Sequence, residues 1–499
     1  SKAESNPDAI AIQSPDRPGL SYGALYKQVQ EVGITLRSMG LQRNDRVAIG
    51  LPNGPEMAVA FLSISTWATS APLNPSYRIR EFDFYLSDLN AKALILPQGS
   101  ESPALSVART KGIPVIELSV LPGSPAGVFN LLGEVPSKGS AVGSPLEHAQ
   151  AADIALVLHT SGTTSRPKIV SLTHSNICTS AGNVSASLAL SEVDRCLNVM
   201  PLFHIHGLIG ALLSSIDAGA SVVCTPGFDA LKFYGWVEAS YPTWYTAVPT
   251  MHQLILSRAA NNMDIVKQHP LRFIRSCSAS LPPSVMADLE AVFHAPVLEA
   301  YGMTEASHQM ACNPLPPRDQ KPGSVGVSTG TEIAIMDEVG LLPQGEIGEI
   351  VIRGKNVFQG YENNPIANRE AFTDGWFRTG DEGYLDMDDY LFLTGRIKEI
   401  INRGGEKISP REVDEVLLEH SGVAQAVTFS IKHSTLGEDV AAAVVLREGI
   451  EVTEPEIREF IASRLAPYKV PRKIEFLDEI PKGPTGKVQR IGLAEKLGL

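Results

Sequence analysis

The sequence reads Thr160-Ser161-Gly162-Thr163-Thr164-Ser165-Arg166-Pro167-Lys168, one residue after the apolar run Ile154 to Leu158. The apolar run predicts a buried strand, and the loop that follows is rich in hydroxyl groups and ends on a lysine. Because Gly162 lets backbone amides approach a ligand closely, amides, hydroxyls and an ammonium group can together replace the water around phosphates. The spacing is not that of a Walker A loop, since no glycine directly precedes Lys168. We predict a polyphosphate cradle, with a polar surface loop as the alternative.

The bulk composition is that of a globular protein with more than one domain. A chain of 499 residues is too long for a single core. Its 43% hydrophobic and 19% charged residues are ordinary values. A net charge of −13 disfavours sequence-independent nucleic-acid binding, which needs a basic surface, but it permits anion binding in a locally basic pocket.

The cysteines and the chain ends bear on the cellular compartment. Five scattered cysteines without metal-type spacing indicate reduced core thiols of an intracellular protein. We expect no membrane span, because no apolar stretch is long enough, and no signal peptide, because Ser1 is not followed by a charged-then-apolar leader. We therefore expect a cytoplasmic location. The end Lys496 to Leu499 is not a peroxisomal tripeptide, so a peroxisomal location is the alternative only if the natural chain continues beyond it.

The order of apolar and polar segments predicts an α/β protein in two parts. Residues 20–100 and 195–300 alternate helix-like stretches with short apolar runs, which is typical of βα units around a largely parallel sheet. Strand candidates in the second stretch are 221–224, 243–247 and 271–275. From about residue 330 the pattern is β-rich, and the last hundred residues have an αβ pattern of their own. We place an N-terminal domain at 1–395, a hinge at 396–399 and a C-terminal domain at 400–499.

A second motif, Tyr301-Gly302-Met303-Thr304-Glu305, follows the apolar pair at 297–298. A tyrosine can stack on a purine, a threonine hydroxyl can contact a phosphate, and a glutamate can hold a divalent cation that bridges phosphates. A strand end with a surface glutamate is an equal alternative for this pentapeptide on its own.

Two further motifs lie downstream. The stretch Trp376-Phe377-Arg378-Thr379-Gly380-Asp381 ends on an acid that suits ribose hydroxyls, and Arg396 could support that contact. A turn aspartate paired with a surface arginine is the alternative. The stretch Pro481-Lys482-Gly483-Pro484-Thr485-Gly486-Lys487 presents a lysine on a Gly/Pro loop near the C-terminus, and a solvated lysine is its alternative.

The four motifs, in this order and over nearly the whole chain, resemble the adenylate-forming superfamily of acyl-CoA synthetases, luciferases and nonribosomal peptide adenylation domains. The resemblance implies an α/β fold with a large N-terminal domain of mixed sheets and flanking helices. That domain would include a small β-barrel-like part and carry a smaller, mobile C-terminal α+β lid. It also implies two steps: a carboxylate and Mg-ATP give an acyl-adenylate and pyrophosphate, and a thiol then attacks the adenylate.

The resemblance also implies a role for individual residues. Lys487, Thr304 and Glu305 would be catalytic, and Glu305 would bind Mg²⁺. Lys398 would be the hinge residue, and Gly404 and Gly405 would line the coenzyme A tunnel, for which a Gly-rich turn is the alternative. The ATP and AMP site would comprise Thr160, Ser161, Gly162, Thr163, Thr164, Lys168, Glu299, Ala300, Tyr301, Thr304, Asp381 and Arg396.

The segments expected around the acid are polar. The stretch 201–207 carries two imidazoles, 276–281 is rich in serine, and a histidine stands three residues after the motif glutamate. We predict an acid pocket formed by His204, Ser278 and His308. A long acyl tail would leave these groups unpaired at a cost of about 1–3 kcal/mol each, whereas a short acid with a second carboxylate would satisfy them. Structural histidines, with His204 as an aromatic gate, are the alternative.

Four stretches, at 159–168, 244–250, 272–281 and 401–410, closely resemble the oxalate–CoA ligases of plants and fungi. This closer resemblance implies oxalate as substrate, oxalyl-CoA as product and a role in oxalate breakdown. One departure is Ile169, where a glycine commonly follows the loop lysine. A ligase for medium-chain or aryl acids and an acyl-loading module for a carrier protein are the other readings. The sequence does not indicate an oligomeric state.

Overall fold

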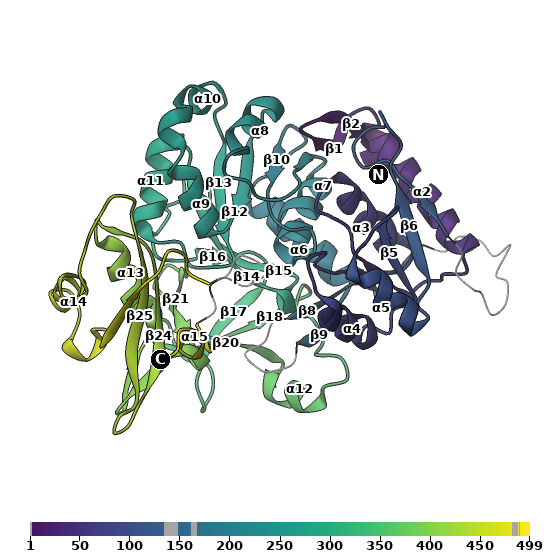
Figure 1. Cartoon of the computed structure of the whole chain (residues 1–499). Coiled ribbons are helices and arrows are strands. Elements are labelled where there is room, and N and C mark those ends of the chain that lie inside the picture. The colour runs from purple at the N-terminus through teal and green to yellow at the C-terminus, as the bar shows by residue number, and fades with distance from the viewer. Residues whose placement is uncertain (1, 134–147, 161–166, 482–487, 489) are drawn as a thin grey trace.

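The computed structural model describes residues 2–133, 148–160, 167–481, 488 and 490–499. Two large sheets with helices between and outside them form the N-terminal domain, and the C-terminal elements lie together at one side of it (Figure 1). The chain therefore has the predicted α/β architecture, with a large and a small domain and mixed sheets.

The first large sheet has the strand order β16-β15-β14-β13-β12-β10-β11-β1-β2. Its strands are β1 (Ile10–Ser14), β2 (Arg17–Ser21), β10 (Arg195–Asn198), β11 (Ser221–Cys224), β12 (Trp244–Ala247), β13 (Phe273–Cys277), β14 (Val297–Met303), β15 (His308–Cys312) and β16 (Val327–Ser328). Strands β10 to β14 are parallel, so their carboxyl ends meet at one edge of the sheet, where α/β proteins bind ligands. The three predicted strands of this region are confirmed, although β13 begins two residues later than expected.

The second large sheet has the order β7-β6-β5-β3-β4-β8-β9. Its strands are β3 (Arg46–Ile49), β4 (Thr69–Pro72), β5 (Ala93–Pro97), β6 (Val115–Ser119), β7 (Asn130–Leu132), β8 (Ile154–Thr160) and β9 (Lys168–Thr173). The run at 154–158 is the predicted buried strand. The returning strand β9, which was not predicted, pairs antiparallel with β8.

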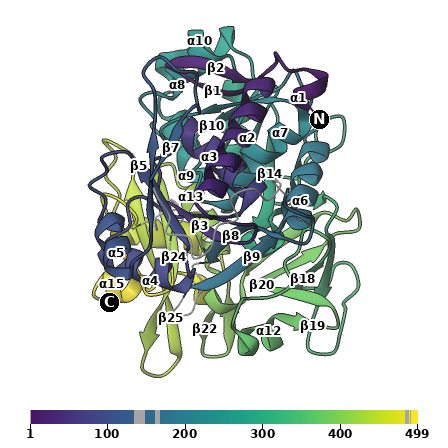
Figure 2. The ribbon, with the colours of Figure 1, turned by 90° about the vertical axis from the view of Figure 1, so that its right-hand side faces the viewer.

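Helices form three layers around the two sheets. One core joins the inner faces of both sheets to the helices α2 (Tyr22–Ser38), α3 (Pro55–Trp67), α6 (His174–Ser187) and α7 (Ser214–Ala218) and the π-helix η1 (His206–Leu213). A second core packs α8 (Phe233–Ser240), α9 (Pro249–Leu256), α10 (Met263–Gln268) and α11 (Pro283–Phe293) on the outer face of the first sheet. A third packs α4 (Ile79–Asp88) and α5 (Pro103–Lys111) on the outer face of the second. Figure 2 shows the same arrangement from the side of α4 and α5.

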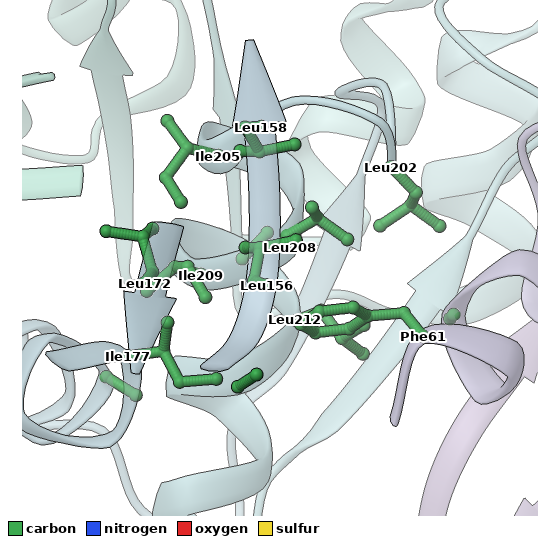
Figure 3. Packing of buried hydrophobic residues seen from close by; sticks show 14 of the residues in the cluster. Phe61, Leu156, Leu158, Leu172, Ile177, Leu202, Ile205, Leu208, Ile209 and Leu212 are labelled. Carbon is green, nitrogen blue, oxygen red and sulfur yellow. The ribbon is translucent and has the colours of Figure 1, made fainter. Parts of the chain in front are cut away.

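The hairpin and the π-helix are held in one apolar cluster. Thr173 ends β9 and caps α6, because its side chain accepts a hydrogen bond from the Asn176 amide. Figure 3 shows the packing of side chains from β8, β9, α6 and η1, namely Leu156, Leu158, Leu172, Ile177, Leu208, Ile209 and Leu212. Strands β8 and β9 and the π-helix η1, which begins two residues after His204, are therefore built on a shared core.

The third sheet is antiparallel and corresponds to the predicted small β-barrel-like part. It contains β17 (Glu332–Met336), β18 (Gly348–Arg353), β19 (Phe372–Thr373), β20 (Trp376–Leu385) and β21 (Leu391–Arg396), with α12 (Pro365–Ala371) beside it. Strand β21 leads into the short helix η4 (Ile397–Glu399) and then into the C-terminal domain.

The C-terminal domain has a sheet of its own, in the order β23-β22-β25-β24 with β26 beside β25. Its elements are β22 (Ile401–Arg403), β23 (Glu406–Ile408), α13 (Pro410–Glu419), β24 (Val423–His433), β25 (Gly437–Leu446), α14 (Glu454–Ala462), η5 (Pro467–Lys469), β26 (Lys473–Phe476) and α15 (Leu493–Lys496). Helix α13 docks on the N-terminal domain, where Arg411 Nη1 donates to the Leu393 carbonyl at 2.8 Å and Ser409 Oγ donates to the Thr394 carbonyl.

The remaining short helices are α1 (Lys2–Ser5), η2 (Ala259–Asn262) and η3 (Thr304–Ala306). Within the described ranges, no helix is both long and apolar enough to cross a membrane.

Candidate active site

The two described ends of the predicted phosphate loop lie side by side. Thr160 pairs with Lys168 across the hairpin, while Ser161, Gly162, Thr163 and Thr164 lie outside the described residues. His159 Nε2, next to the loop, lies 3.0 Å from Asp88 Oδ2 on α4 and anchors that end of β8. Lys168 Nζ lies 4.4 Å from the centroid of the Tyr361 ring. The loop lysine is thus directed toward the segment that follows β18.

Glu305 is a buried carboxylate that shares the neighbour Tyr361 with that lysine, and it is a candidate for holding a metal. It lies in η3 with Thr304 and accepts a hydrogen bond from the Tyr361 hydroxyl at 2.8 Å. Burial raises the pKa of the Glu305 carboxyl, and the Tyr361 hydrogen bond and the positive Lys168 and Arg396 act in the opposite direction. A cation would favour the ionised form further, since a positive charge stabilises a carboxylate.

Three of the predicted nucleotide residues converge at the junction of the first and third sheets. Tyr301 on β14 donates its hydroxyl hydrogen to Asp381 on β20. Arg396 on β21 lies opposite Asp381 in the strand register, and its Nε is 2.9 Å from Asp381 Oδ1. The Asp381 charge raises the pKa of the Arg396 guanidinium. The structure therefore groups an aromatic ring, a carboxylate and a guanidinium.

Glu299 and Ala300 precede this group on β14 and are buried. Glu299 Oε1 accepts a hydrogen bond from the Leu281 amide at 2.9 Å. Burial raises the pKa of the Glu299 carboxyl to about 7, although the positive Arg411 of α13 lowers it. Ala300 pairs with Cys277 on β13. In the described contacts Glu299 therefore ties β14 to the segment after β13.

The three residues predicted for the acid pocket are linked through a fourth, His206. Ser278 follows β13, and its Oγ lies 3.0 Å from His206 Nδ1. The rings of His206 and His308 stack with centroids 5.1 Å apart. His204 contributes differently, because its Nδ1 accepts a hydrogen bond from the His206 backbone amide at 3.2 Å. His206 begins the π-helix, a rare element that is frequent at functional sites.

A fully buried arginine, Arg275, contacts both stacked histidines through its guanidinium group. Its Nη2 is 2.9 Å from His308 Nε2 and donates to Gln309 Oε1 at 2.8 Å. Its Nη1 is 3.2 Å from His206 Nε2 and donates to Thr246 Oγ1 at 3.2 Å. Arg275 Nε is buried without a hydrogen-bond partner, and none of these described partners is a carboxylate.

The backbone that carries His308 is strained. Ser307 and His308 have φ values of 54° and 109°, a region that residues other than glycine rarely occupy. Two hydrogen bonds hold this turn: Ser307 Oγ donates to the Asn356 carbonyl at 2.8 Å, and Ser180 Oγ donates to the Ser307 carbonyl at 2.7 Å. Neighbouring elements therefore fix the conformation that sets the place of the His308 ring.

The C-terminal candidates lie apart from these groups in their described contacts. Lys398 is exposed on η4, between the two domains. Gly404 and Gly405 form the turn between β22 and β23, with φ values of 61° and 100° that favour glycine. Their hydrogen bonds stay within the C-terminal domain, to the Leu436 carbonyl and to Asn402 Oδ1. Lys487 lies outside the described residues.

Sequence reasoning missed Arg275, His206, Thr246 and Tyr361 as members of the site. A signal for Arg275 was present, because it shares one face of the strand with Phe273 and Cys277 and so occupies an inward-facing position. Charged residues are almost never fully buried without a function or a partner. The role of Tyr361 had no local signal, since it depends on contact with Glu305 across 56 residues of sequence.

The chain is similar to known proteins over most of its length. The family model "AMP-binding enzyme" matches residues 1–362, and the model "AMP-binding enzyme C-terminal domain" matches residues 412–487. An oxalate–CoA ligase of Arabidopsis thaliana is 46% identical over 98% of this chain and 95% of its own length. An oxalate–CoA ligase of Saccharomyces cerevisiae is 44% identical over 91% of this chain and 87% of its own.

Among solved structures, ATP-bound MatB from Rhodopseudomonas palustris superposes with a TM-score of 0.87. The two sequences are 28% identical, and the match covers 99% of this chain and 98% of that one.

The approach of Gly210 to His308 gives a first test of the site. A Cβ at Gly210 would lie 2.3 Å from His308 Nε2, so Gly210→Ala must displace the ring. We expect the kcat/KM for the acid substrate to fall by about tenfold or more, with the KM for ATP nearly unchanged and a stability loss of about 1–3 kcal/mol. Steady-state kinetics and thermal unfolding measure these effects.

Gly182→Ala is the matched control, because a Cβ on this glycine of α6 meets nothing within 4 Å. It should leave the acid kinetics unchanged. Unaltered acid kinetics in Gly210→Ala would show that the position of His308 does not matter for the reaction.

The raised pKa of Glu299 predicts a pH-dependent cost to stability. Between about pH 4.5 and 7 the native carboxyl keeps a proton that the unfolded chain has released, so the native state loses stability as the pH rises through this window. Glu299→Gln retains an acceptor for the Leu281 amide and cannot ionise. We expect it to exceed the wild type in unfolding free energy by about 3 kcal/mol at pH 8, and by much less at pH 5. Denaturant unfolding at both pH values measures the difference, and a difference independent of pH would contradict the assignment.

Proposed function

The chain belongs to the AMP-binding enzyme family, and we propose that it is an AMP-forming ligase that joins oxalate to coenzyme A through an oxalyl-adenylate. The relatives named as oxalate–CoA ligases match it over almost their full length, which supports both the thiol ligase activity and the choice of acid. Acyl-adenylate chemistry requires ATP and coenzyme A as substrates.

The observation that carries the choice of acid is the polar group in which Ser278 is hydrogen-bonded to His206 and His206 stacks on His308. Ser278 follows the carboxyl end of β13, His206 begins η1, and His308 stands three residues after Glu305. A hydrocarbon tail placed here would offer no acceptor to the Ser278 hydroxyl, at a cost of about 1–3 kcal/mol. Oxalate is the shortest dicarboxylate, so its second carboxylate can accept hydrogen bonds at the place where other acids present carbon.

In the first step, one carboxylate oxygen attacks the α-phosphorus of ATP, and the bond from that phosphorus to the bridging oxygen breaks and releases pyrophosphate. Both reactants are anions, so the barrier is largely electrostatic. We propose that Lys168 and the loop before it hold the β- and γ-phosphates, that Thr304 contacts the α-phosphate, and that Asp381 and Arg396 bind the ribose. Tyr301 would lie against the adenine, beside Glu299 and Ala300.

We propose that Mg²⁺ enters this site together with ATP. Within the described ranges, no group of three or more His, Cys, Asp or Glu side chains could hold a metal. A single buried carboxylate, Glu305, fits an ion that takes its other ligands from phosphates and water. When bound, Mg²⁺ neutralises phosphate charge, and Glu305 fixes where that neutralisation occurs.

In the second step, the sulfur of coenzyme A attacks the acyl carbon, AMP leaves with the electron pair of the broken C–O bond, and the thiol proton passes to solvent. Lys487 must neutralise charge in the first step and make room for the thiol in the second, which a rotating lid achieves. We propose domains at 1–395 and 400–499 with a hinge at 396–399 around Lys398. The tunnel for coenzyme A would then form beside Gly404 and Gly405.

We propose a cytoplasmic location, because all five cysteines are free thiols and four of them are buried. A peroxisomal location stays the alternative if the natural chain is longer. The partners we propose are the small molecules oxalate, ATP and coenzyme A, without nucleic acid.

A panel of acids tests the proposed function. We expect oxalate to have a higher kcat/KM than malonate, acetate, hexanoate and 4-coumarate. The reason is that the polar side chains of the pocket can bind the second carboxylate of a short acid. Pyrophosphate release with each acid measures the first step, and thioester formation with free coenzyme A measures the second.

A higher kcat/KM for a hexanoate or 4-coumarate substrate would identify a medium-chain or aryl-acid ligase. Adenylate formation without transfer to free coenzyme A would identify a module that loads a carrier protein.

A further inference from the structure

The positive charge of Arg275 has no described counter-ion, although its side chain is fully buried. An arginine stays protonated in proteins, and a buried charge without a partner is costly. The two imidazoles, the hydroxyl and the amide oxygen around it satisfy hydrogen bonds but carry no negative charge. The protein therefore holds a cation next to the proposed acid pocket that only an anion from outside this group can balance.

The same guanidinium determines which way the hydrogen bonds around it run. Arginine only donates, so a nitrogen that faces it must accept. His308 Nε2 at 2.9 Å and His206 Nε2 at 3.2 Å are therefore acceptors, which places the proton of each neutral imidazole on Nδ1. Thr246 agrees with this direction, because its oxygen accepts from Arg275 and lies 2.6 Å from His206 Nε2, to which its hydroxyl can donate.

The direction of hydrogen-bond donation that Arg275 sets also determines the role of Ser278. With its proton on Nδ1, His206 donates to Ser278 Oγ at 3.0 Å. A serine hydroxyl has one hydrogen, which is then left to donate to another acceptor. The hydrogen bonds thus run in one direction, from Arg275 through Thr246 and His206 to Ser278. As a result, the Ser278 hydroxyl at the end of β13 is available as a donor. Such a pocket suits an acceptor-only group such as a carboxylate and disfavours a group that donates.

We propose that Arg275 is the specificity-determining positioning residue of the acid site: it fixes the tautomers of His206 and His308, orients the Ser278 hydroxyl and so selects an acid with a second carboxylate. This inference rests on the proposed function, because it names the group that makes the second carboxylate of oxalate recognisable. Arg275 acts through the histidines and the serine and does not itself contact the reacting atoms.

A comparison of oxalate with oxamate as substrates distinguishes a role of Arg275 in specificity from a merely structural one. Oxamate has nearly the same shape, but a neutral amide, which also donates hydrogen bonds, replaces its second carboxylate. We expect the wild type to adenylate oxalate with a much higher kcat/KM than oxamate. Release of pyrophosphate measures this step. Arg275→Met removes the charge at similar volume, and we expect it to lower the oxalate-to-oxamate ratio of kcat/KM by about tenfold or more. The KM for ATP should change less than about twofold.

Two further variants and one control separate the effects of the Arg275 charge, of its forked donor geometry and of the Thr246 hydroxyl. Arg275→Lys keeps the charge but loses the forked donor geometry, so it should restore part of the ratio. Thr246→Val keeps the charge and removes only the route through the Thr246 hydroxyl, while Arg275 still faces His206 at 3.2 Å, so it should lower the ratio less than Arg275→Met does. Arg272→Met is the matched control, because this neighbouring arginine pairs with Asp194 at 3.0 Å and is partly exposed. It should leave the ratio unchanged.

The outcomes separate the inference from the function on which it rests. If the wild type does not prefer oxalate, the proposed function fails. If the wild type prefers oxalate and Arg275→Met lowers both kcat/KM values equally, the role of Arg275 is structural and the inference is overturned. Should Arg275→Met not fold, the hydrogen positions in the wild type decide instead, and a hydrogen on Nε2 of His206 or His308 overturns the inference.

A neutron structure of the wild-type enzyme at neutral pH tests the tautomers without any substitution. We expect the exchangeable hydrogen on Nδ1 of both His206 and His308. A hydrogen on Nε2 of either ring would contradict the relay.

Discussion

The turn from Thr304 to His308 joins the two halves of the site, and its backbone is under strain. Its first two residues belong to the proposed phosphate and Mg²⁺ positions, and its last belongs to the proposed acid pocket. Positive φ values at Ser307 and His308 cost about 1–3 kcal/mol each and persist only where the surroundings enforce them. Bonds from Ser180, from Ser307 and to the Glu305 carbonyl hold the turn. A fixed turn sets the distance between the acid and the phosphate.

The turn also explains why both large sheets are needed. The hairpin β8–β9 brings Lys168 toward Tyr361, which in turn donates to Glu305. On the other side, η1 brings His206 against His308 and Ser278. The hairpin and η1 share one apolar core, so the phosphate side and the acid side cannot move independently without disturbing it (Figure 3). Adenylation requires that coupling, since the two anions must be held in reach of each other.

Much of the fold and part of the site could be predicted from the sequence, for physical reasons that differ by residue. The runs that became β11 and β12 are continuous and apolar, as buried parallel strands must be. The pairing of Tyr301, Asp381 and Arg396 was accessible because each sits in a motif with its own chemistry. Strand β9 was missed because its two ends merge into the polar loop and the helix cap. Tyr361 and Arg275 were missed because their partners are distant in sequence, and no local pattern records a contact made by folding.

The central claim is that the pocket recognises a second carboxylate through donors oriented by a buried cation. The most direct measurement is a crystal structure of the wild-type enzyme with oxalate and a non-reactive ATP analogue. The account predicts one carboxylate of oxalate facing the α-phosphate and the other within hydrogen-bond distance of Ser278 Oγ and the His308 ring. An oxalate whose second carboxylate contacts neither group, in an otherwise closed site, would contradict it.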